Sequence, residues 1–355
     1  MKIVHTADLH IGSALTARLP AEKVRQRKNE LINSFERMVE EARLIGARLF
    51  IIAGDMFDTE EVAERTIERI LGIISRARGI DFLYLPGNHE KNALVDSGLM
   101  LPDNLRIFGR EWTYFDYGEL TVAGRCEMSA DMFDSLAINS GAKNIVVLHG
   151  TVGDRSSAEV VGLKDAKERG IDYIALGHYH SYGAYEVDAA CQAVYSGTPE
   201  GRGFDEAGDK GFVIVDTSGR LINHRFYPFA KRALRIAQLD VSGMDSESEI
   251  LGAATELLAA IRQEDIVRLE IIGCHAPELS VDKSYLTSRW ADRFFYFEVK
   301  DSSRTALPTD ALIRDKSLKG EFIRLCIGRT DLSEEDREEI IRIGLCALRG
   351  EEVTV

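Results

Sequence analysis

The sequence predicts an α/β fold with a largely parallel core sheet, followed by a smaller α+β domain. Through the first half of the chain, short apolar runs alternate with longer amphipathic segments. This alternation is typical of parallel strands joined by crossover helices. After residue 180 the pattern changes to short segments of alternating apolar and polar residues, which favour antiparallel strands.

The first half contains the expected strands of the core sheet and two long helices. Apolar runs that predict strands occupy residues 2–6, 48–54, 81–87, 144–150 and 172–178. Apolar residues at helical spacing predict helices at residues 22–45 and 61–77. Strands this apolar are buried on both sides, so we expect the core sheet to be covered on both faces.

The second half is expected to complete the core and then form a separate unit. Short strands are predicted at residues 182–187, 192–197, 211–217 and 220–227, with a hairpin turn at 217–219. The segment FYPFAK marks a boundary near residue 228. Beyond it, strands at 233–241, 266–273 and 293–300 and a helix at 248–262 predict the small α+β domain.

The C-terminal segment contains one further predicted helix. Ser333, followed three residues later by Asp336, resembles a capping box. The apolar residues of one helical face are Ile340, Ile341, Leu345 and Leu348. This stripe either packs on the chain's own second domain or docks on another protein. The predicted domains are therefore residues 1–228, 229–328 and a helical segment at 329–355.

Composition limits the function classes. A net charge of −14 argues against a protein that coats nucleic acid through overall positive charge, but permits a local site whose charge comes from metal ions. The five cysteines are scattered without a C-x-x-C pair, which argues against disulfides and zinc fingers. No apolar run approaches the roughly 20 residues of a membrane span, and no signal peptide is evident, so a cytoplasmic location is expected.

Polar side chains follow the strands of the first half. They are Asp8, His10, Asp55, Asn88, His149, His178 and His180. Because ligands bind outside the carboxyl ends of strands in open α/β sheets, we expect these residues to converge. Imidazole, carboxylate and amide donors without thiolates suit manganese, iron or zinc. Seven donors are too many for one tetrahedral ion and suit two ions that share a carboxylate, the arrangement that clamps both oxygens of a phosphoryl displacement.

The spacing of His178 and His180 supports two ions. In an extended segment, alternate residues point the same way and lie less than about 7 Å apart. Each of these histidines can then face a different ion. An isolated buried histidine such as His5 is usually structural, but clusters after successive strands reverse that balance.

The motifs at these strand ends resemble those of a known family. They read D-x-H-x-G at 8–12, G-D-x-x-D at 54–58, G-N-H-E at 87–90, H-G at 149–150 and G-H-x-H at 177–180. As a set they resemble the calcineurin-like metallophosphoesterases. The stretches VHTADLHIG and YSGTPEGRGFDEAGDKG are similar to the family's DNA-repair exonuclease branch of SbcD- and YhaO-like nuclease subunits. The resemblance implies a β-sheet sandwich flanked by helices, with a smaller α+β capping domain.

The resemblance also implies a ligand set for two divalent ions. One ion would be held by Asp8, His10, Asp55 and His180. The other would be held by Asp55, Asn88, His149 and His178. Asp55 would then bridge them. Mn²⁺ is the expected metal, with Fe²⁺, Zn²⁺ or Mg²⁺ as alternatives, and a metal-activated water would be the nucleophile.

Three neighbouring residues have implied supporting roles. His89 resembles the family's catalytic histidine, which assists the leaving group or the transition state. Asp58 is expected to orient a histidine ligand without binding metal itself. Glu90 stands where the family usually has aspartate, and we expect this difference to tune the site without abolishing it.

The expected function is a two-metal-dependent DNA nuclease, exonuclease or endonuclease, acting in DNA repair. An SbcC-type coiled-coil ABC ATPase and a second copy of the chain are candidate partners, and the absence of a Walker motif means that any ATP dependence comes from a partner. Basic segments at 17–28, 224–235 and 289–300 are candidate DNA contacts. The alternatives are a phosphatase or phosphodiesterase for small nucleotides or phosphoesters, and a non-catalytic scaffold, which the complete ligand set disfavours.

Overall fold

The computed structural model describes residues 1–13, 15, 19–90, 93–276, 279, 281–305, 314 and 316–349. The chain forms two compact units, each of which is described separately below. The first comprises residues 1–235 with 264–266, and the second comprises 236–263 and the chain from 267 onward. Among the described residues, no helix is both long and apolar enough to span a membrane.

The first unit is built on two six-stranded sheets, of which the first contains the N-terminal strand. Its strand order is β14-β13-β1-β2-β3-β4. The strands are β1 (Lys2–Thr6), β2 (Ala47–Ala53), β3 (Asp81–Leu85), β4 (Leu105–Ile107), β13 (Gly211–Asp216) and β14 (Asn223–Pro228). β1 to β4 run parallel, whereas β13 and β14 add as an antiparallel hairpin at one edge.

The second sheet has the order β11-β12-β10-β7-β6-β5. Its strands are β5 (Thr113–Asp116), β6 (Leu120–Gly124), β7 (Lys143–His149), β10 (Tyr173–Gly177), β11 (Gly183–Glu186) and β12 (Gln192–Tyr195). The four central strands are parallel, and β5 and β11 are antiparallel edges. Short elements cover its outer face: η1 (Met132–Ser135), α4 (Leu163–Ala166) and the pair β8 (Thr151–Gly153) and β9 (Val160–Gly162).

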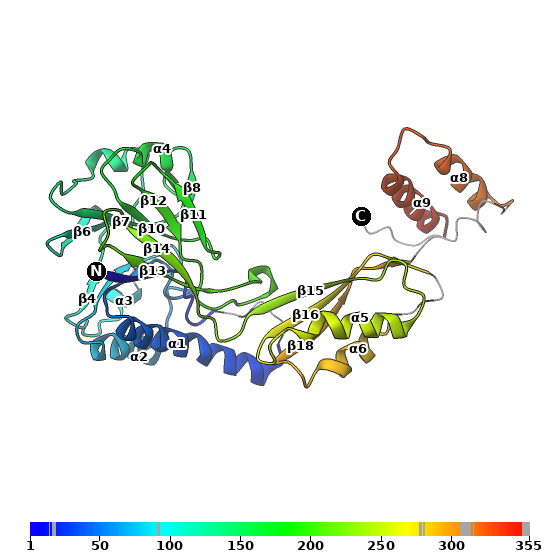
Figure 1. The fold of residues 1–355 in the computed structure, drawn as a ribbon, viewed down its shortest axis with the longest axis horizontal. Coiled ribbons are helices and arrows are strands. Elements are labelled where there is room, and N and C mark those ends of the chain that lie inside the picture. The colour runs from blue at the N-terminus through cyan, green and yellow to red at the C-terminus, as the bar shows by residue number, and fades with distance from the viewer. Residues whose placement is uncertain are drawn as a thin grey trace. The chain divides into compact units, whose positions relative to one another are not determined.

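The two sheets pack face to face, which confirms the expected sandwich. Strand β2 shows how the alternation of side chains builds this arrangement. Leu49 and Ile51 point into the core between the sheets, while Phe50 and Ile52 point outward and pack with α1 (Ala21–Leu44) and α2 (Glu64–Arg76). In the ribbon, these two helices lie on the side of the first unit away from α4 (Figure 1). The expectation from the apolar runs that strands are covered on both faces is met, with a second sheet supplying one of the covers.

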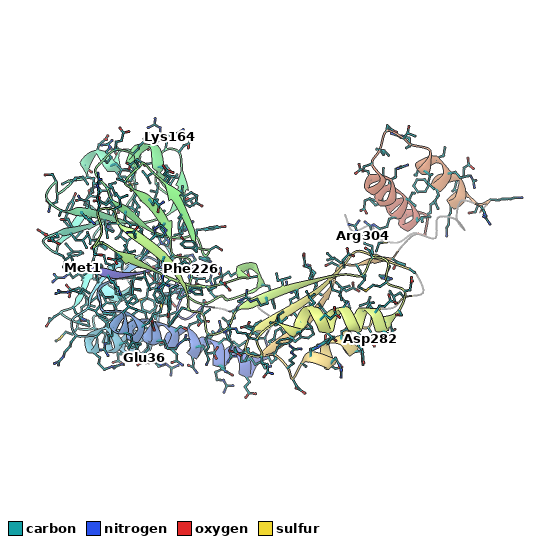
Figure 2. The ribbon with its side chains drawn as sticks, viewed as in Figure 1. Met1, Glu36, Lys164, Phe226, Asp282 and Arg304 are labelled. Atoms are coloured by element: carbon teal, nitrogen blue, oxygen red, sulfur yellow. The ribbon has the colours of Figure 1, made fainter. Side chains whose placement is uncertain are left out.

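Most predicted elements of the first unit lie within a few residues of their expected bounds. The strand predicted at 48–54 is Ala47–Ala53, and the helix predicted at 22–45 is Ala21–Leu44. The elements between β3 and β7, which include α3 (Ala93–Asp96), were not predicted, because they are too short to show a clear period. On the outer surface, Glu36 of α1 pairs with Arg69 and Arg76 of α2 (Figure 2).

The second unit contains the predicted small α+β arrangement. Its sheet has the order β15 (Leu234–Asp240), β16 (Ile266–Ile272) and β18 (Tyr296–Asp301). Two helices, α5 (Glu247–Ala259) and α6 (Lys283–Trp290), pack on it through one apolar cluster. Both begin at capped residues, since the Ser246 side chain accepts from Glu249 N and the Asp282 side chain accepts from Tyr285 N. Short strands β17 (Cys274–His275) and β19 (Arg304–Thr305) pair in parallel.

The C-terminal helix α9 (Glu334–Arg349) packs against α8 (Leu318–Ile327), which was not predicted. Ser333 caps α9 as expected, accepting from Asp336 N at 3.0 Å. Ile341 and Leu345 are buried in the contact with α8, while Ile340 and Leu348 are each 40% exposed. The apolar stripe is therefore half covered within this helical pair. The predicted division at residues 228 and 328 stays a prediction.

Candidate metal centre

The predicted ligands lie at the carboxyl ends of β1, β2, β3, β7 and β10. His149 is the last residue of β7, and the other six lie on the loops that follow their strands. Three of these strands belong to the first sheet and two to the second. The carboxyl ends of both sheets therefore contribute to one site. The loops after β1 and β2 are joined directly, because Asp8 N donates to Gly54 O and His10 N donates to Asp55 O, each at 3.0 Å.

Four of the predicted ligands have an uncommon backbone conformation. The φ angles are 53° at Asp8, 44° at His10, 52° at Asp55 and 101° at His178. Among the described residues other than glycine, only Glu168 shares a positive φ. Such conformations cost free energy and persist where the surrounding structure holds them. Their concentration here indicates that the loops are held in place for the side chains they carry.

Glycines at the strand ends allow the loops to approach one another closely. A Cβ atom on Gly54 or Gly177 would lie closer than 3.0 Å to the His149 ring, and one on Gly87 would meet the Asp55 carboxylate equally closely. Of these three glycines, only Gly54 has a positive φ, of 95°. Close approach is thus the common requirement at all three positions.

The first predicted ligand group is assembled around Asp8, His10 and His180. One ligand atom from each lies within 4.8 Å of the others. The Nε2 atoms of His10 and His180 are 3.1 Å apart, and Asp55 Oδ2 lies 3.8 Å from His10 Nε2. Asp8 is also anchored, since its carboxylate accepts from His178 N at 2.9 Å.

The second predicted group lies on the other side of Asp55. His149 Nε2 is 3.3 Å from Asp55 Oδ2 and 2.9 Å from Asn88 Oδ1. The His178 ring centroid is 5.3 Å from that of His149. Asp55 Oδ2 therefore stands between the two groups, where a bridging ligand would be needed. The structure brings all seven predicted ligands together.

The orientation of the imidazoles fits metal binding. His149 Nδ1 lies 2.9 Å from Ala53 O, His180 Nδ1 lies 2.7 Å from Glu206 Oε1, and His10 Nδ1 lies 3.0 Å from Asp58 Oδ1. His149 and His180 thus each direct Nδ1 to a hydrogen-bonding acceptor, whereas His10 Nδ1 lies close to Asp58 but has no hydrogen-bond partner among the described residues. In all three rings the Nε2 atom is left directed into the site. A metal-binding histidine typically donates its other ring N–H in this way. The donor set therefore fits divalent ions.

His89 and Asp58 lie at the edge of this cluster. The His89 side chain is 47% exposed, and its Nε2 atom is 4.0 Å from Asp55 Oδ2. Its backbone N donates to Asp55 Oδ1 at 3.2 Å, and its Nδ1 lies 3.3 Å from Asp58 O. The His89 ring is thus held beside the ligands with one face open to a substrate.

A family model of known proteins matches most of the segment that forms this site. The calcineurin-like phosphoesterase family model matches residues 1–190. The chain belongs to this family. The phosphoesterase is accordingly a metal-dependent hydrolase of phosphoesters, and its sandwich is the fold of that family.

Three curated relatives extend the comparison beyond the family domain. The DNA double-strand break repair protein Mre11 of Methanopyrus kandleri is 25% identical, with 99% of this chain and 82% of that protein covered. The Mre11 of Methanosarcina acetivorans is 27% identical over 82% of this chain, and the match spans 49% of that protein. The uncharacterized metallophosphoesterase YhaO of Bacillus subtilis is 24% identical, with 78% of this chain and 73% of YhaO covered.

Burial and mutual contacts shift the ionisation of the ligands. Burial raises the pKa of Asp8 to about 6 and lowers that of His10 to about 3. Burial opposes ionisation of Asp55, but the hydrogen bond and charge of His149 outweigh it and lower the pKa to about 2. Burial also opposes protonation of His149, yet Asp55 and Asp8 raise its pKa to about 9. A cation at this phosphoesterase site would therefore compete with the His149 proton.

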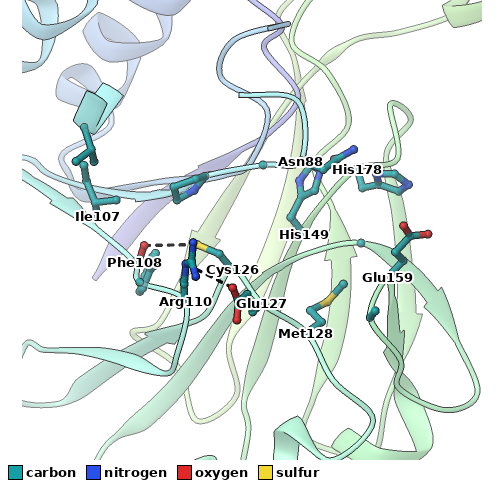
Figure 3. Close-up of a pocket in the computed structure, with 16 residues that line it drawn as sticks. Asn88, Ile107, Phe108, Arg110, Cys126, Glu127, Met128, His149, Glu159 and His178 are labelled. Carbon is teal, nitrogen blue, oxygen red and sulfur yellow. Dashed lines mark hydrogen bonds and ion pairs between the residues drawn. The ribbon is translucent and has the colours of Figure 1, made fainter. Parts of the chain in front are cut away.

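A cavity of about 680 Å³ opens beside the second ligand group (Figure 3). Asn88, His149 and His178 form one end of it in the view. The remaining wall includes Ile107, Phe108, Arg110, Glu127 and Met128. The guanidinium of Arg110 lies 3.4 Å from the Glu127 carboxylate. The volume lies in the range of small-ligand sites.

Two exposed tyrosines lie on the chain at or shortly after the histidine pair. Tyr179, between His178 and His180, is 54% exposed, and its ring centroid lies 5.6 Å from that of Tyr195. Tyr185 is 39% exposed and meets Tyr195 at 5.9 Å. Tyr195 is buried and donates its hydroxyl to Gly150 O at 2.7 Å. A buried ring thus supports two exposed rings next to the candidate metal centre.

Sequence reasoning misplaced part of the predicted basic surface. Arg27 and Arg232 are buried, and both donate to Glu30, so they are not available for DNA. Arg293 donates to Leu258 O at the end of α5. Arg18 lies outside the described residues. Arg25 and Lys28 remain exposed on α1.

Three further residues support the site through contacts that the sequence did not predict: Glu90, Arg202 and Glu206. Glu90 is fully buried, where burial raises its pKa to about 7, and it accepts from Phe57 N and Gly87 N. It lies outside the ligand groups and ties together the loops that carry Asp55 and Asn88. The segment YSGTPEGRGFDEAGDKG was the only signal for Arg202 and Glu206, and its motif carried no assigned role.

Proposed function

We propose that this phosphoesterase is a two-metal-dependent DNA nuclease that hydrolyses phosphodiester bonds. The observation that carries the proposal is the arrangement of Asp55 Oδ2 between His10 Nε2, at 3.8 Å, and His149 Nε2, at 3.3 Å. A carboxylate placed between two sets of imidazoles is what a pair of ions needs as a bridge. The resemblance to two Mre11 proteins, both named as DNA double-strand break repair proteins, supports DNA as the substrate.

The ligand roles follow the two groups in this proposal. One ion would be held by Asp8, His10, Asp55 and His180. The other would be held by Asp55, Asn88, His149 and His178. When bound, the ions supply positive charge to the phosphodiester and lower the pKa of a nucleophilic water. We propose Mn²⁺ as the metal, because the site combines imidazoles with oxygen donors and lacks thiolates.

The protein's own groups orient the substrate and move a proton. His89 is partly exposed beside Asp55, so its ring can reach the leaving oxygen of a phosphodiester on the open side. Asp58 O, at 3.3 Å from His89 Nδ1, fixes the orientation of that ring. The Asp58 carboxylate lies 3.0 Å from His10 Nδ1, where it would accept the proton of a His10 ring that binds metal through Nε2. Both functions place Asp58 in support of the reaction without a direct metal contact.

The exposed apolar residues of α9 support a proposal about partners. A cytoplasmic role in DNA repair with an SbcC-type coiled-coil ABC ATPase fits the exposed Ile340 and Leu348 of α9, which could enter an apolar interface. A second copy of the chain is the other candidate for this surface. The second unit is proposed to act as a cap that orients DNA.

A small phosphoester is the second candidate substrate. The cavity of about 680 Å³ beside Asn88 and His149 favours it, because a pocket of this size can hold a nucleotide. Glu127 and Glu159 line this cavity together with apolar residues. Arg110 lines the same cavity and pairs with Glu127 at 3.4 Å, and the apolar side chains of Ile107, Phe108 and Met128 suit a neutral base or aryl group.

The test compares DNA with a small ester in the presence of Mn²⁺. End-labelled double-stranded DNA, single-stranded DNA and bis-p-nitrophenyl phosphate are incubated with the wild-type protein and with His89→Ala. Cleavage of DNA by the wild type, reduced about 10²–10⁴-fold in the variant, is the expected result. Hydrolysis of the ester alone would refute the nuclease assignment for the isolated chain and favour the small substrate.

A further inference from the structure

Arg202 joins the two carboxylates that face the Nδ1 atoms of the histidines in the first ligand group. Its Nη1 donates to Asp58 Oδ1 at 3.1 Å. Its Nε and Nη2 donate to Glu206 Oε1 at 3.0 and 2.7 Å. The side chain is only 15% exposed, so these bonds form largely out of water and are correspondingly strong.

These contacts close a circuit around one half of the metal centre. His10 Nδ1 faces Asp58 at 3.0 Å, and His180 Nδ1 faces Glu206 at 2.7 Å. On the opposite side of the two rings, the Nε2 atoms are 3.1 Å apart and point to the same space. Among the residues that the structure describes, Arg202 alone bonds to both carboxylates behind the rings.

The chemistry of the guanidinium determines which atom donates each hydrogen bond around the two rings. Arg202 has N–H groups only and accepts nothing. When His180 binds metal through Nε2, its Nδ1 carries a proton and donates to Glu206. The 3.1 Å approach of Arg202 Nη2 to His180 Nδ1 then brings two donors together at the shared Glu206 Oε1. The arginine thus acts on the imidazole through the carboxylate.

The loop that carries Arg202 is itself anchored. Glu200, two residues earlier, is fully buried and accepts from Arg27 Nη2 at 3.2 Å and from Lys231 N at 2.8 Å. The backbone N of Arg202 donates to Glu206 Oε2 at 2.8 Å. The guanidinium therefore starts from a fixed backbone, as an orienting group requires.

We propose that Arg202 is a positioning residue that sets metal affinity in one half of the centre. It would act on the ion that Asp8, His10, Asp55 and His180 would hold, and this inference rests on the two-metal assignment proposed above. The other half does not depend on it, because His149 is oriented by a backbone carbonyl, Ala53 O. The two halves of the centre should therefore respond differently to loss of this arginine.

Arginine is required here for its geometry as well as its charge. Its planar fork reaches Asp58 with one nitrogen and Glu206 with two others. A lysine would place one nitrogen and could serve one carboxylate at a time. Arg202→Lys should therefore restore part of the Mn²⁺ affinity that Arg202→Gln loses. The difference between the two variants measures the contribution of the positive charge, and the remaining loss in Arg202→Lys measures the contribution of bridging both carboxylates.

The experiment is a titration of the metal-free protein with Mn²⁺. Calorimetry measures the affinity of each class of site, and electron paramagnetic resonance detects the coupled ion pair. Two classes of site are expected for the wild type. In Arg202→Gln, one class should weaken by about 10–100-fold, the usual effect of losing a group that orients a metal ligand, while the other stays within about twofold. The matched control is Arg169→Gln, which removes an arginine bound to Asp134 and Phe133 O and should change neither class.

A double variant tests the route of action. If Arg202 acts through Glu206, the losses in Arg202→Gln and Glu206→Gln should sum to more than the loss in the double variant. Equal weakening of both classes, or unchanged affinity in Arg202→Gln, would overturn the proposal, as would a wild type with no paired Mn²⁺ signal. The titration contains no DNA, so a protein that binds two ions but cleaves no DNA would refute the nuclease and leave this inference standing.

Discussion

At the scale of single residues, the candidate metal centre depends on side chains that are absent as well as on those present. Gly177 ends β10 of the second sheet, and a Cβ there would collide with Ala53 O of β2 in the first sheet and with the His149 ring. The two sheets can therefore bring their ligands together only where the backbone carries no side chain.

Gly177→Ala should consequently damage both folding and metal binding. Overpacking of this kind typically costs about 1–3 kcal/mol of unfolding free energy, and Mn²⁺ affinity should fall with it. Chemical denaturation of the metal-free variant measures the first effect. Gly252→Ala in α5 is the control, because its Cβ meets nothing within 4 Å and should raise stability by about 0.5–1 kcal/mol. A Gly177→Ala protein as stable as the wild type would contradict this account.

The predicted ligands could be found from sequence because their spacing is local. Asp8 and His10, or His178 and His180, each lie in one short segment after an apolar run, and the edge of a sheet supplies the rest of the argument. Arg202 could not be placed, since its partner Asp58 is 144 positions away. For the same reason Arg27 was read as a surface charge, although distant Glu200 buries it.

At the scale of elements, a buried ion-pair cluster joins α1 to the segment that leads into β15. Glu30 of α1 accepts from Arg27 at 2.8 Å and from Arg232 at 2.9 Å, and Lys231 lies 3.0 Å away. Burial alone would raise the pKa of Glu30, but these three partners outweigh it and lower the pKa to about 2.

This shift predicts a loss of stability in acid. The pKa of Glu30 lies below its ordinary value of 4.5, so the unfolded chain binds this proton more readily. The stabilisation is complete above pH 4.5 and is lost as the pH falls towards about 2. Glu30→Gln should lower the unfolding free energy at pH 7 by about 3–5 kcal/mol and flatten its pH dependence in this window. Denaturation curves recorded in chelator check both, and an unchanged slope would argue against the prediction.

The elements themselves were predictable to different degrees for a physical reason. Long apolar strands such as β2 and the helix α1 show their period clearly. The covering of the strands was ambiguous, because an apolar run demands burial on both faces without saying whether a helix or a sheet provides it. Short strands such as β4 and β5 depend on their neighbours for stability and leave little pattern in the sequence.

Strand β11 and the loop before it supply the exposed tyrosines beside the centre. Replacing Tyr179 and Tyr185 by leucine should weaken binding of single-stranded DNA by about 1–3 kcal/mol for each lost base contact. Fluorescence anisotropy with a labelled oligonucleotide measures this. The paired phenylalanine variants keep both rings and should bind like the wild type. Equal binding by the leucine variants would show that these rings do not contact the strand.

At the scale of the whole molecule, acidic charge dominates. The net charge of −14 repels a polyanion, and several basic residues of the predicted DNA surface are occupied in ion pairs, such as Arg235 with Asp209 at 2.7 Å. Positive charge for the scissile phosphate must then come mainly from the ions bound at the centre. DNA affinity should therefore depend on metal to an unusual extent.

Removal of metal should weaken DNA binding by at least about tenfold at constant ionic strength. The measurement uses His89→Ala, which keeps the ligands while slowing cleavage, and compares Mn²⁺ with chelator. The control is Asp55→Asn, which removes the carboxylate proposed to bridge the ions, so that metal should no longer promote DNA binding. Affinity that is the same with and without metal would place the DNA contacts elsewhere.

The distribution of the chain between its two units has a practical consequence. Residues 264–266 belong to the first unit although they lie between segments of the second. Within the first unit, Asp265 Oδ1 accepts from Ala233 N at 3.0 Å, and Arg232 donates to Glu264 O at 2.8 Å. A protein truncated after residue 235 would lack these two hydrogen bonds. Dissection of the two units therefore calls for a linker that retains residues 264–266, and a simple stop codon would not give a faithful half.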